Sequence, residues 1–221
     1  MLYEDNHIIA VNKRPSEIVQ GDKTGDLPLS ETVKSYIKRK YNKPGNVFLG
    51  VVHRLDRPVS GVVLFARTGK ALERLNGMLR RREIRKLYWA IVKELPGLAE
   101  GEAVHYLVRD RSKNKSFPVD KDREGAKEAR LLFRRLKSSD RYHLLEIDLL
   151  TGRHHQIRAQ LSAMGAPVKG DLKYGSPRSN PDASISLHAR RVTFTHPVSK
   201  KVIDITADPP EDPLWEFFLH S

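Results

Sequence analysis

Short runs of hydrophobic residues, separated by polar turns, recur along the chain and predict a fold rich in β-strands. Some runs alternate with polar residues and others are continuous, as in a sheet that other elements cover in part. The predicted strands are 7–11, 47–52, 62–66, 87–92, 103–108, 131–136, 143–149, 187–195 and 202–206.

Hydrophobic residues at helical spacing predict three helices, over residues 30–41, 69–82 and 155–164. Ser30 is the expected N-cap of the first helix, and Gly165 is the expected stop of the third. Single helices interrupt the strands without regular β-α-β alternation, so the predicted fold class is α+β, built on a mostly antiparallel mixed β-sheet. Residues 110–125 read as a mobile surface loop, and the proline-rich residues 208–213 as an ordinary loop.

Composition narrows the class of protein. The 221 residues include 40 Lys+Arg against 27 Asp+Glu, a formal net charge of +13, which favours a polyanionic partner such as nucleic acid. The absence of cysteine excludes disulfides, thiol nucleophiles and cysteine-based zinc sites. No apolar helix, lipidation motif or signal peptide stands out, and no linker separates two cores. We therefore expect one cytoplasmic domain over residues 1–221 that binds no membrane.

A carboxylate between two arginines, at Asp56, is the most informative polar feature. Arg54 and Arg57 flank it, Pro58 and Gly61 favour a turn, and apolar runs lie on both sides. Neighbouring positive charge is expected to lower the pKa of Asp56, which suits a nucleophile or a base. The alternative is a structural turn residue that is ion-paired with an arginine.

A second polar segment, Thr151-Gly152-Arg153-His154-His155-Gln156-Ile157-Arg158, enters the third predicted helix. There Arg158 falls on a different face from the apolar residues, where it would bridge Asp56 or hold a phosphate; otherwise it is a solvated surface residue. The two histidines lack further ligands at convincing spacing, so we expect no metal.

The adjacent aromatic residues Tyr88 and Trp89 follow Lys86 at the start of a predicted strand. Neighbouring strand residues point to opposite faces, so one ring can pack in the core while the other faces a groove. On structural grounds alone, both are packing residues.

Together these segments resemble the RluA-type pseudouridine synthases, which isomerise selected uridines in RNA. The resemblance rests on His53-Arg54-Leu55-Asp56 with Ser60-Gly61, on Lys86, Tyr88 and Ala90, on residues 151–158 with Gly170-Asp171 and Tyr174-Gly175, and on residues 187–197. It covers almost the whole chain. Two departures are Val59 in place of threonine and Lys13-Arg14-Pro15-Ser16 in place of Lys-Pro-x-Gly.

The resemblance implies a pseudouridine synthase fold around a central cleft and an isomerase that needs no cofactor. It implies that Asp56 is the essential aspartate, that Arg158 pairs with it, and that Tyr88 stacks on the uracil; Arg153 is the fallback for Arg158. A flipped uridine in ribosomal or transfer RNA is the implied substrate. Residues expected to contact RNA are Arg54, Arg57, Lys86 and Arg153. We expect a monomer without a separate S4-type RNA-binding domain.

Two other functions remain open. The first is an RNA-binding protein that has lost catalysis, which would require loss of the aspartate, tyrosine or arginine, and all three are present. The second is a glycosidase, which usually needs a proton-donating carboxylate near the first, and none stands out.

Overall fold

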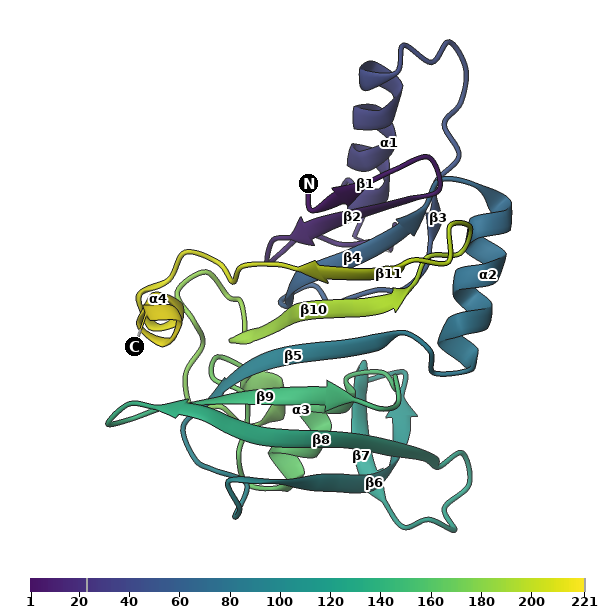
Figure 1. The fold of residues 1–221 in the computed structure, drawn as a ribbon. Helices are drawn as coiled ribbons and strands as arrows, with labels where there is room; N and C mark the ends of the chain where they lie inside the picture. The colour runs from purple at the N-terminus through teal and green to yellow at the C-terminus, as the bar shows by residue number, and fades with distance from the viewer. Residues whose placement is uncertain (23, 221) are drawn as a thin grey trace. The chain divides into compact units, whose positions relative to one another are not determined.

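The computed structural model describes residues 1–22 and 24–220, and the chain divides into two compact units (Figure 1). The first unit comprises Met1–Ile84 and Arg190–Pro209; the second comprises Arg85–Ala189 and Pro210–Ser221. Both units combine antiparallel strands with helices, so the predicted α+β class is confirmed. No helix in residues 1–22 and 24–220 has the length and apolar character needed to cross a membrane.

The first unit is a small sheet with two helices. In it, strands β1, β2, β4 and β10 are neighbours in that order, β3 also pairs with β4, and β11 pairs with β10. The elements are β1 (Tyr3–Glu4), β2 (Ile8–Lys13), α1 (Leu29–Lys40), β3 (Gly50–Val51), β4 (Ser60–Ala66), α2 (Gly69–Arg80), β10 (Leu187–Thr195, in this unit from Arg190) and β11 (Val202–Thr206).

Strand β4 is the centre of this unit, because all seven of its residues are buried. Leu64 of this strand packs in one hydrophobic cluster with Leu75 of α2 and Phe194 of β10. The continuous apolar run that predicted this strand therefore reflects burial on both faces.

The N-cap prediction for α1 was wrong. Pro28 occupies the N-cap in extended geometry without a side-chain hydrogen bond, and Ser30 is buried inside the first turn. An extended proline leads readily into a helix, because its fixed φ suits the entry. Serine is a favoured N-cap residue, but this helix is held by burial of Val33 and Ile37 and not by a side-chain cap.

The second unit is a five-stranded antiparallel sheet with helices on both of its faces. Its strand order is β5, β9, β8, β6 and β7. The elements are β5 (Arg85–Val92), β6 (Glu100–Asp110), β7 (Lys115–Val119), β8 (Lys127–Ser138), β9 (His143–Leu149), α3 (Gln156–Ala163), the 3-10 helix η1 (Leu172–Tyr174) and α4 (Pro213–His220).

Helices α3 and α4 cover opposite faces of this sheet. Ala159 of α3 packs against Ala129 of β8, and α3 lies behind β8 and β9 in Figure 1. Trp215 and Phe218 of α4 pack with Ile91 and Trp89 of β5. Because neighbouring strand residues alternate between faces, Tyr88 lies on the α3 face and Trp89 on the α4 face.

Two sequence predictions of local structure were wrong, and one helix was not predicted. Residues 110–125 contain strand β7, which pairs with β6, so they are not one mobile loop. The strand predicted over residues 47–52 shortens to β3. Helix α4 went unpredicted, because Pro213 at its start resembled loop chemistry although proline is tolerated in a first helical turn.

Candidate functional site

Asp56 lies in a tight turn of the first unit, between β3 and β4. The Val59 N–H donates to the Asp56 carbonyl over 3.0 Å, which closes the turn. Leu55 beside it is buried at 9% exposure, while the Asp56 side chain is half-buried. A buried anchor next to a half-exposed carboxylate presents that carboxylate from a rigid backbone.

A buried cation, Lys13 at the end of β2, contacts the backbone of this turn. Its side chain is 1% exposed. Its Nζ donates to the carbonyls of Arg14, Arg57 and Val59 over 2.9, 3.0 and 2.6 Å. Burial lowers the pKa of Lys13 to about 8, although the nearby carboxylates of Glu17 and Asp56 favour its charged form.

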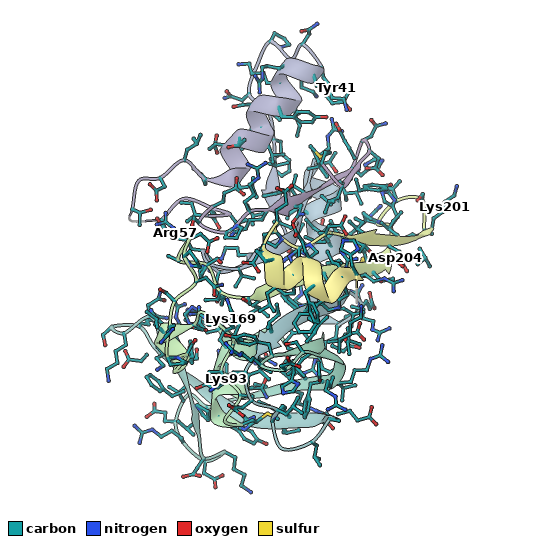
Figure 2. All side chains as sticks on the ribbon, turned by 90° about the vertical axis from the view of Figure 1, so that its left-hand side faces the viewer. Tyr41, Arg57, Lys93, Lys169, Lys201 and Asp204 are labelled. Atoms are coloured by element: carbon teal, nitrogen blue, oxygen red, sulfur yellow. The ribbon has the colours of Figure 1, made fainter. Side chains whose placement is uncertain are left out.

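The arginines that flank Asp56 lie at the surface. Arg57, labelled in Figure 2, forms an ion pair with Asp26 of the segment before α1, and Arg54 is exposed. The Arg57 guanidinium therefore has a partner other than Asp56. The local sequence indicates the positive charge of these flanking arginines, whereas Lys13 contributes a buried cation from a distant strand.

The backbone at Ser16 keeps the turn of the family pattern despite the departure from its sequence. Ser16 adopts a φ of 71°, a left-handed conformation that favours glycine, at the position where the pattern has glycine. Its N–H donates to the Arg57 carbonyl over 2.9 Å. The turn therefore forms with serine, held by the residue that follows Asp56.

Arg158, in the second unit, is buried rather than solvated. It is 5% exposed, and its Nε and Nη2 donate to the two oxygens of Asp171 over 2.6 and 2.9 Å. Its guanidinium also lies 5.0 Å from the centre of the Tyr174 ring. This bidentate geometry fixes the plane of the guanidinium and commits one of its edges to Asp171. The expected pairing of Arg158 with Asp56 stays a prediction.

Asp171 belongs to the sequence motif, but the sequence alone indicates no role for it. It is 1% exposed and lies at the start of η1, after Gly170. A buried acid within a motif that also supplies a buried arginine is a signal for an ion pair, because unpaired buried charge is costly.

Tyr88 and Lys86 lie on the same face of β5. Tyr88 is 7% exposed and pairs in register with Ile147. A Cβ at Gly152 would lie 3.5 Å from Lys86 Nζ, so the lysine reaches the segment that precedes α3. Burial lowers the pKa of Lys86 below its usual value. Of the two adjacent rings, Trp89 packs under α4, and Tyr88 shares a sheet face with α3.

The segment before α3 is ordered by side-chain hydrogen bonds. The Gln156 Oε1 accepts from the Thr151 hydroxyl and from the Arg153 N–H. Arg153 is exposed, and its Nε donates to the Glu128 carbonyl. His154 and His155 stack at 3.8 Å, and His155 takes a φ of 52° at the N-cap of α3. Within residues 1–22 and 24–220, no three side chains of the metal-binding types gather as a metal site would require.

The structure thus assigns the predicted residues to two groups. Arg54, Asp56 and Arg57 belong to the first unit, whereas Lys86, Tyr88, Arg153 and Arg158 belong to the second. Within the second unit, Lys86 approaches the segment that holds Arg153, and Arg158 is locked in place by Asp171.

Comparison with solved structures defines the fold class. A human protein described as RNA pseudouridylate synthase domain containing 4 superposes with a TM-score of 0.80 at 23% identity, over 99% of this chain and 90% of its own. Human RNA pseudouridylate synthase domain containing 1 superposes with a TM-score of 0.74. The chain therefore has the fold of these proteins.

Sequence comparison defines the family. The sequence model described as RNA pseudouridylate synthase matches residues 7–163, and the chain belongs to this family. A Synechocystis protein named as an uncharacterized RNA pseudouridine synthase is 34% identical over 216 residues, 95% of this chain and 65% of its own length. Ribosomal large subunit pseudouridine synthase C of Buchnera aphidicola is 34% identical over 94% of this chain and 66% of its own. The chain thus spans about two thirds of these relatives, and the resemblance inferred from the motifs is confirmed.

Proposed function

We propose that this protein isomerises uridine to pseudouridine in RNA, with Asp56 as the essential carboxylate. The single observation that carries the proposal is the rigid turn that presents half-buried Asp56, within the segment that matches the synthase family. Ribosomal RNA is the proposed substrate, because the relatives with a named substrate act on the large ribosomal subunit. Transfer RNA is the second substrate to test.

The reaction breaks the bond between ribose C1′ and uracil N1 and forms a bond from C1′ to C5. The proton on C5 is lost and N1 gains one, so the change is redox-neutral. Asp56 would act as nucleophile or base beside the glycosidic bond. Arg158, its plane set by Asp171, would orient that carboxylate, and Tyr88 would stack on the uracil. In this proposal residues 1–221 work as one catalytic domain.

RNA binding would place the target base outside its stack, at a cost of about a few kcal/mol. Arg54, exposed beside Asp56, is the proposed plug for the vacated position. Arg57, Lys86 and Arg153 would hold phosphates. A protein that modifies RNA in this way is proposed to work in the cytoplasm, as a monomer.

The test is carbodiimide mapping of pseudouridine in unmodified ribosomal and transfer RNA. Wild type should create reverse-transcription stops at defined uridines, and Asp56→Asn should create none while binding RNA with unchanged affinity. Asp204→Asn is the matched control. Asp204 lies on strand β11, where it pairs with the partly exposed Arg191 of β10, so its replacement should leave activity intact. Tight RNA binding by wild type without any stop would favour the non-catalytic RNA-binding protein.

A further inference from the structure

Lys13 is a fully buried charge of the first unit that the proposed chemistry does not use. It ends strand β2 with a side chain that is 1% exposed. Burying an ammonium costs free energy unless every N–H finds an acceptor, whereas an apolar side chain would fill the same space without that cost. Packing alone therefore does not explain a lysine here.

The acceptors of Lys13 are the backbone of the Asp56 turn. Two of its three hydrogen bonds end on the carbonyls of Arg57 and Val59, which follow Asp56, and the shortest, at 2.6 Å, is to Val59. The Val59 N–H in turn donates to the Asp56 carbonyl, and the Ser16 N–H donates to the Arg57 carbonyl. Lys13 thus joins β2 to both residues whose backbone bonds shape the turn.

We propose that Lys13 is a positioning residue, which holds the Asp56 turn so that the carboxylate keeps the orientation required for isomerisation. This inference rests on the proposed function of Asp56. It assigns Lys13 no contact with the substrate. Its ammonium acts through the Arg57 and Val59 carbonyls and through its positive charge behind the turn.

The charge of Lys13 matters as well as its N–H groups. The charged groups that act on it are the carboxylates of Glu17 and Asp56, which favour the ammonium, and Arg57, which opposes it. Because burial brings its pKa to about 8, Lys13 is an ammonium with three N–H groups at neutral pH. A neutral amine keeps only two N–H groups for three carbonyls, and its charge no longer attracts Asp56.

Amide hydrogen exchange tests the structural half of the proposal. In Lys13→Met at neutral pH, the Ser16 and Val59 amides should exchange at least about tenfold faster than in wild type, because their turn loses its clamp. Amides of the β2–β4 ladder should keep their protection, which shows that the unit is folded. Unchanged exchange at Ser16 and Val59 would overturn the proposal.

Kinetics tests the functional half. On an RNA that wild type modifies, Lys13→Met should lower kcat at least about tenfold, or about 1.4 kcal/mol, with KM changed less than about twofold. Lys34→Met, at a partly exposed lysine of α1, is the matched control and should behave as wild type. Wild-type kcat should also fall above about pH 8, and this limb should be missing from Lys13→Met. An unchanged kcat in Lys13→Met would refute the positioning role.

The absence of cysteine permits a rescue experiment. Lys13→Cys is alkylated in denaturant with 2-bromoethylamine, which rebuilds an ammonium of lysine length, and is then refolded. The same protein alkylated with iodoacetamide carries a neutral amide instead. The ammonium form should regain most of the wild-type kcat and the neutral form should not. Equal activity of the two refolded forms would contradict a role for the charge.

The two proposals fail in different ways. If wild type modifies no RNA, the proposed function fails, and hydrogen exchange still decides whether Lys13 clamps the turn. If wild type is active and the Lys13 variants match it, only the positioning role fails. If Lys13→Met does not fold, the pH profile of wild type and the two alkylated proteins supply the decision.

Discussion

At the scale of single residues, the buried pair of Arg158 and Asp171 gives a sharp stability prediction. The two side chains are 6% and 1% exposed. Asp171→Asn keeps the shape but removes the counter-charge of a buried guanidinium, which should cost about 3–5 kcal/mol of unfolding free energy in urea titration. Asp148→Asn is the control, because the Arg85 side chain of that pair is 63% exposed and the loss should stay within about 1 kcal/mol. Equal losses would show that the buried pair contributes no more than a surface pair.

Gly170, next to Asp171, gives a second prediction at this scale. Its φ is +88°, and a Cβ there would lie 2.8 Å from the Asn180 side chain and 2.8 Å from the Ser184 carbonyl oxygen. Gly170→Ala should therefore cost more than the roughly 1 kcal/mol of a left-handed alanine, because the Ser184 backbone cannot move aside cheaply.

Gly97→Ala is the matched control for that substitution. Gly97 has a φ of +80° but no atom within 4 Å of an added Cβ, so only the conformational cost applies. Chemical denaturation of both variants separates the two contributions. The same loss in Gly97→Ala and Gly170→Ala would contradict the clash.

At the scale of elements, helix α1 is tied to strand β1 through Glu4. Tyr36 and Lys40 of α1, together with Tyr41 at its end (Figure 2), donate to the Glu4 carboxylate. Burial opposes ionisation of Glu4, but these hydrogen bonds outweigh it and hold its pKa below the usual value. The stabilisation that this carboxylate provides is therefore present above its unfolded pKa of about 4.3 and lost as the pH falls through the lower folded value.

The corresponding experiment follows the first unit under acid. Unfolding free energy of wild type should decline below about pH 4 more steeply than that of Glu4→Gln, which lacks this proton linkage. Glu31→Gln, which removes an exposed carboxylate paired with Lys34 on α1, should follow wild type. Parallel pH curves for wild type and Glu4→Gln would exclude Glu4 as the source of the acid sensitivity.

How much of these elements the sequence predicts depends on what stabilises them. Strands β9, β10 and β11 have the predicted bounds, because their burial follows the hydrophobic pattern. Strand β7 was not predicted from the sequence, because its buried residue is the polar Ser116. Ser116 is 2% exposed, and its N–H donates to the Tyr174 hydroxyl. A strand that is held by a distant tyrosine leaves no hydrophobic periodicity to detect.

The site residues, like the strands, divide into those that local sequence reveals and those that depend on distant contacts. Motifs single out Asp56, Tyr88 and Arg158, and local charge points to Arg54 and Arg57 beside Asp56 but gives no sign of Lys13. Lys13 lies 43 positions before Asp56 in the sequence, and only the β2–β4 pairing brings its strand beneath the turn. Asp171 pairs with Arg158 across a helix and a loop. Contacts of this kind depend on tertiary packing, which spacing in the sequence does not encode.

At the scale of the whole molecule, the net charge of +13 predicts RNA affinity that falls steeply with salt. The logarithm of the binding constant should decline linearly with the logarithm of salt between about 50 and 200 mM, with a slope near −0.7 to −0.9 for each phosphate neutralised. The joint change Arg80→Ala and Arg82→Ala, at two unpaired cations among the described residues, should make that slope shallower. Fluorescence anisotropy with a labelled RNA measures both slopes. A salt-independent affinity would contradict phosphate contacts as the main source of binding.

The order in which the chain enters the two units has a consequence for biosynthesis. The first unit receives strand β10 and its partner β11 only after the whole of residues 85–189. At a synthesis rate of about 5–20 residues per second, β4 therefore waits roughly 5–20 seconds for its neighbour β10. During that interval its hydrophobic edge is open to other nascent chains or to chaperones. Ribosomes stalled before residue 190 should accordingly carry a protease-sensitive first unit, and the unit should become resistant once residues 190–209 have left the ribosome.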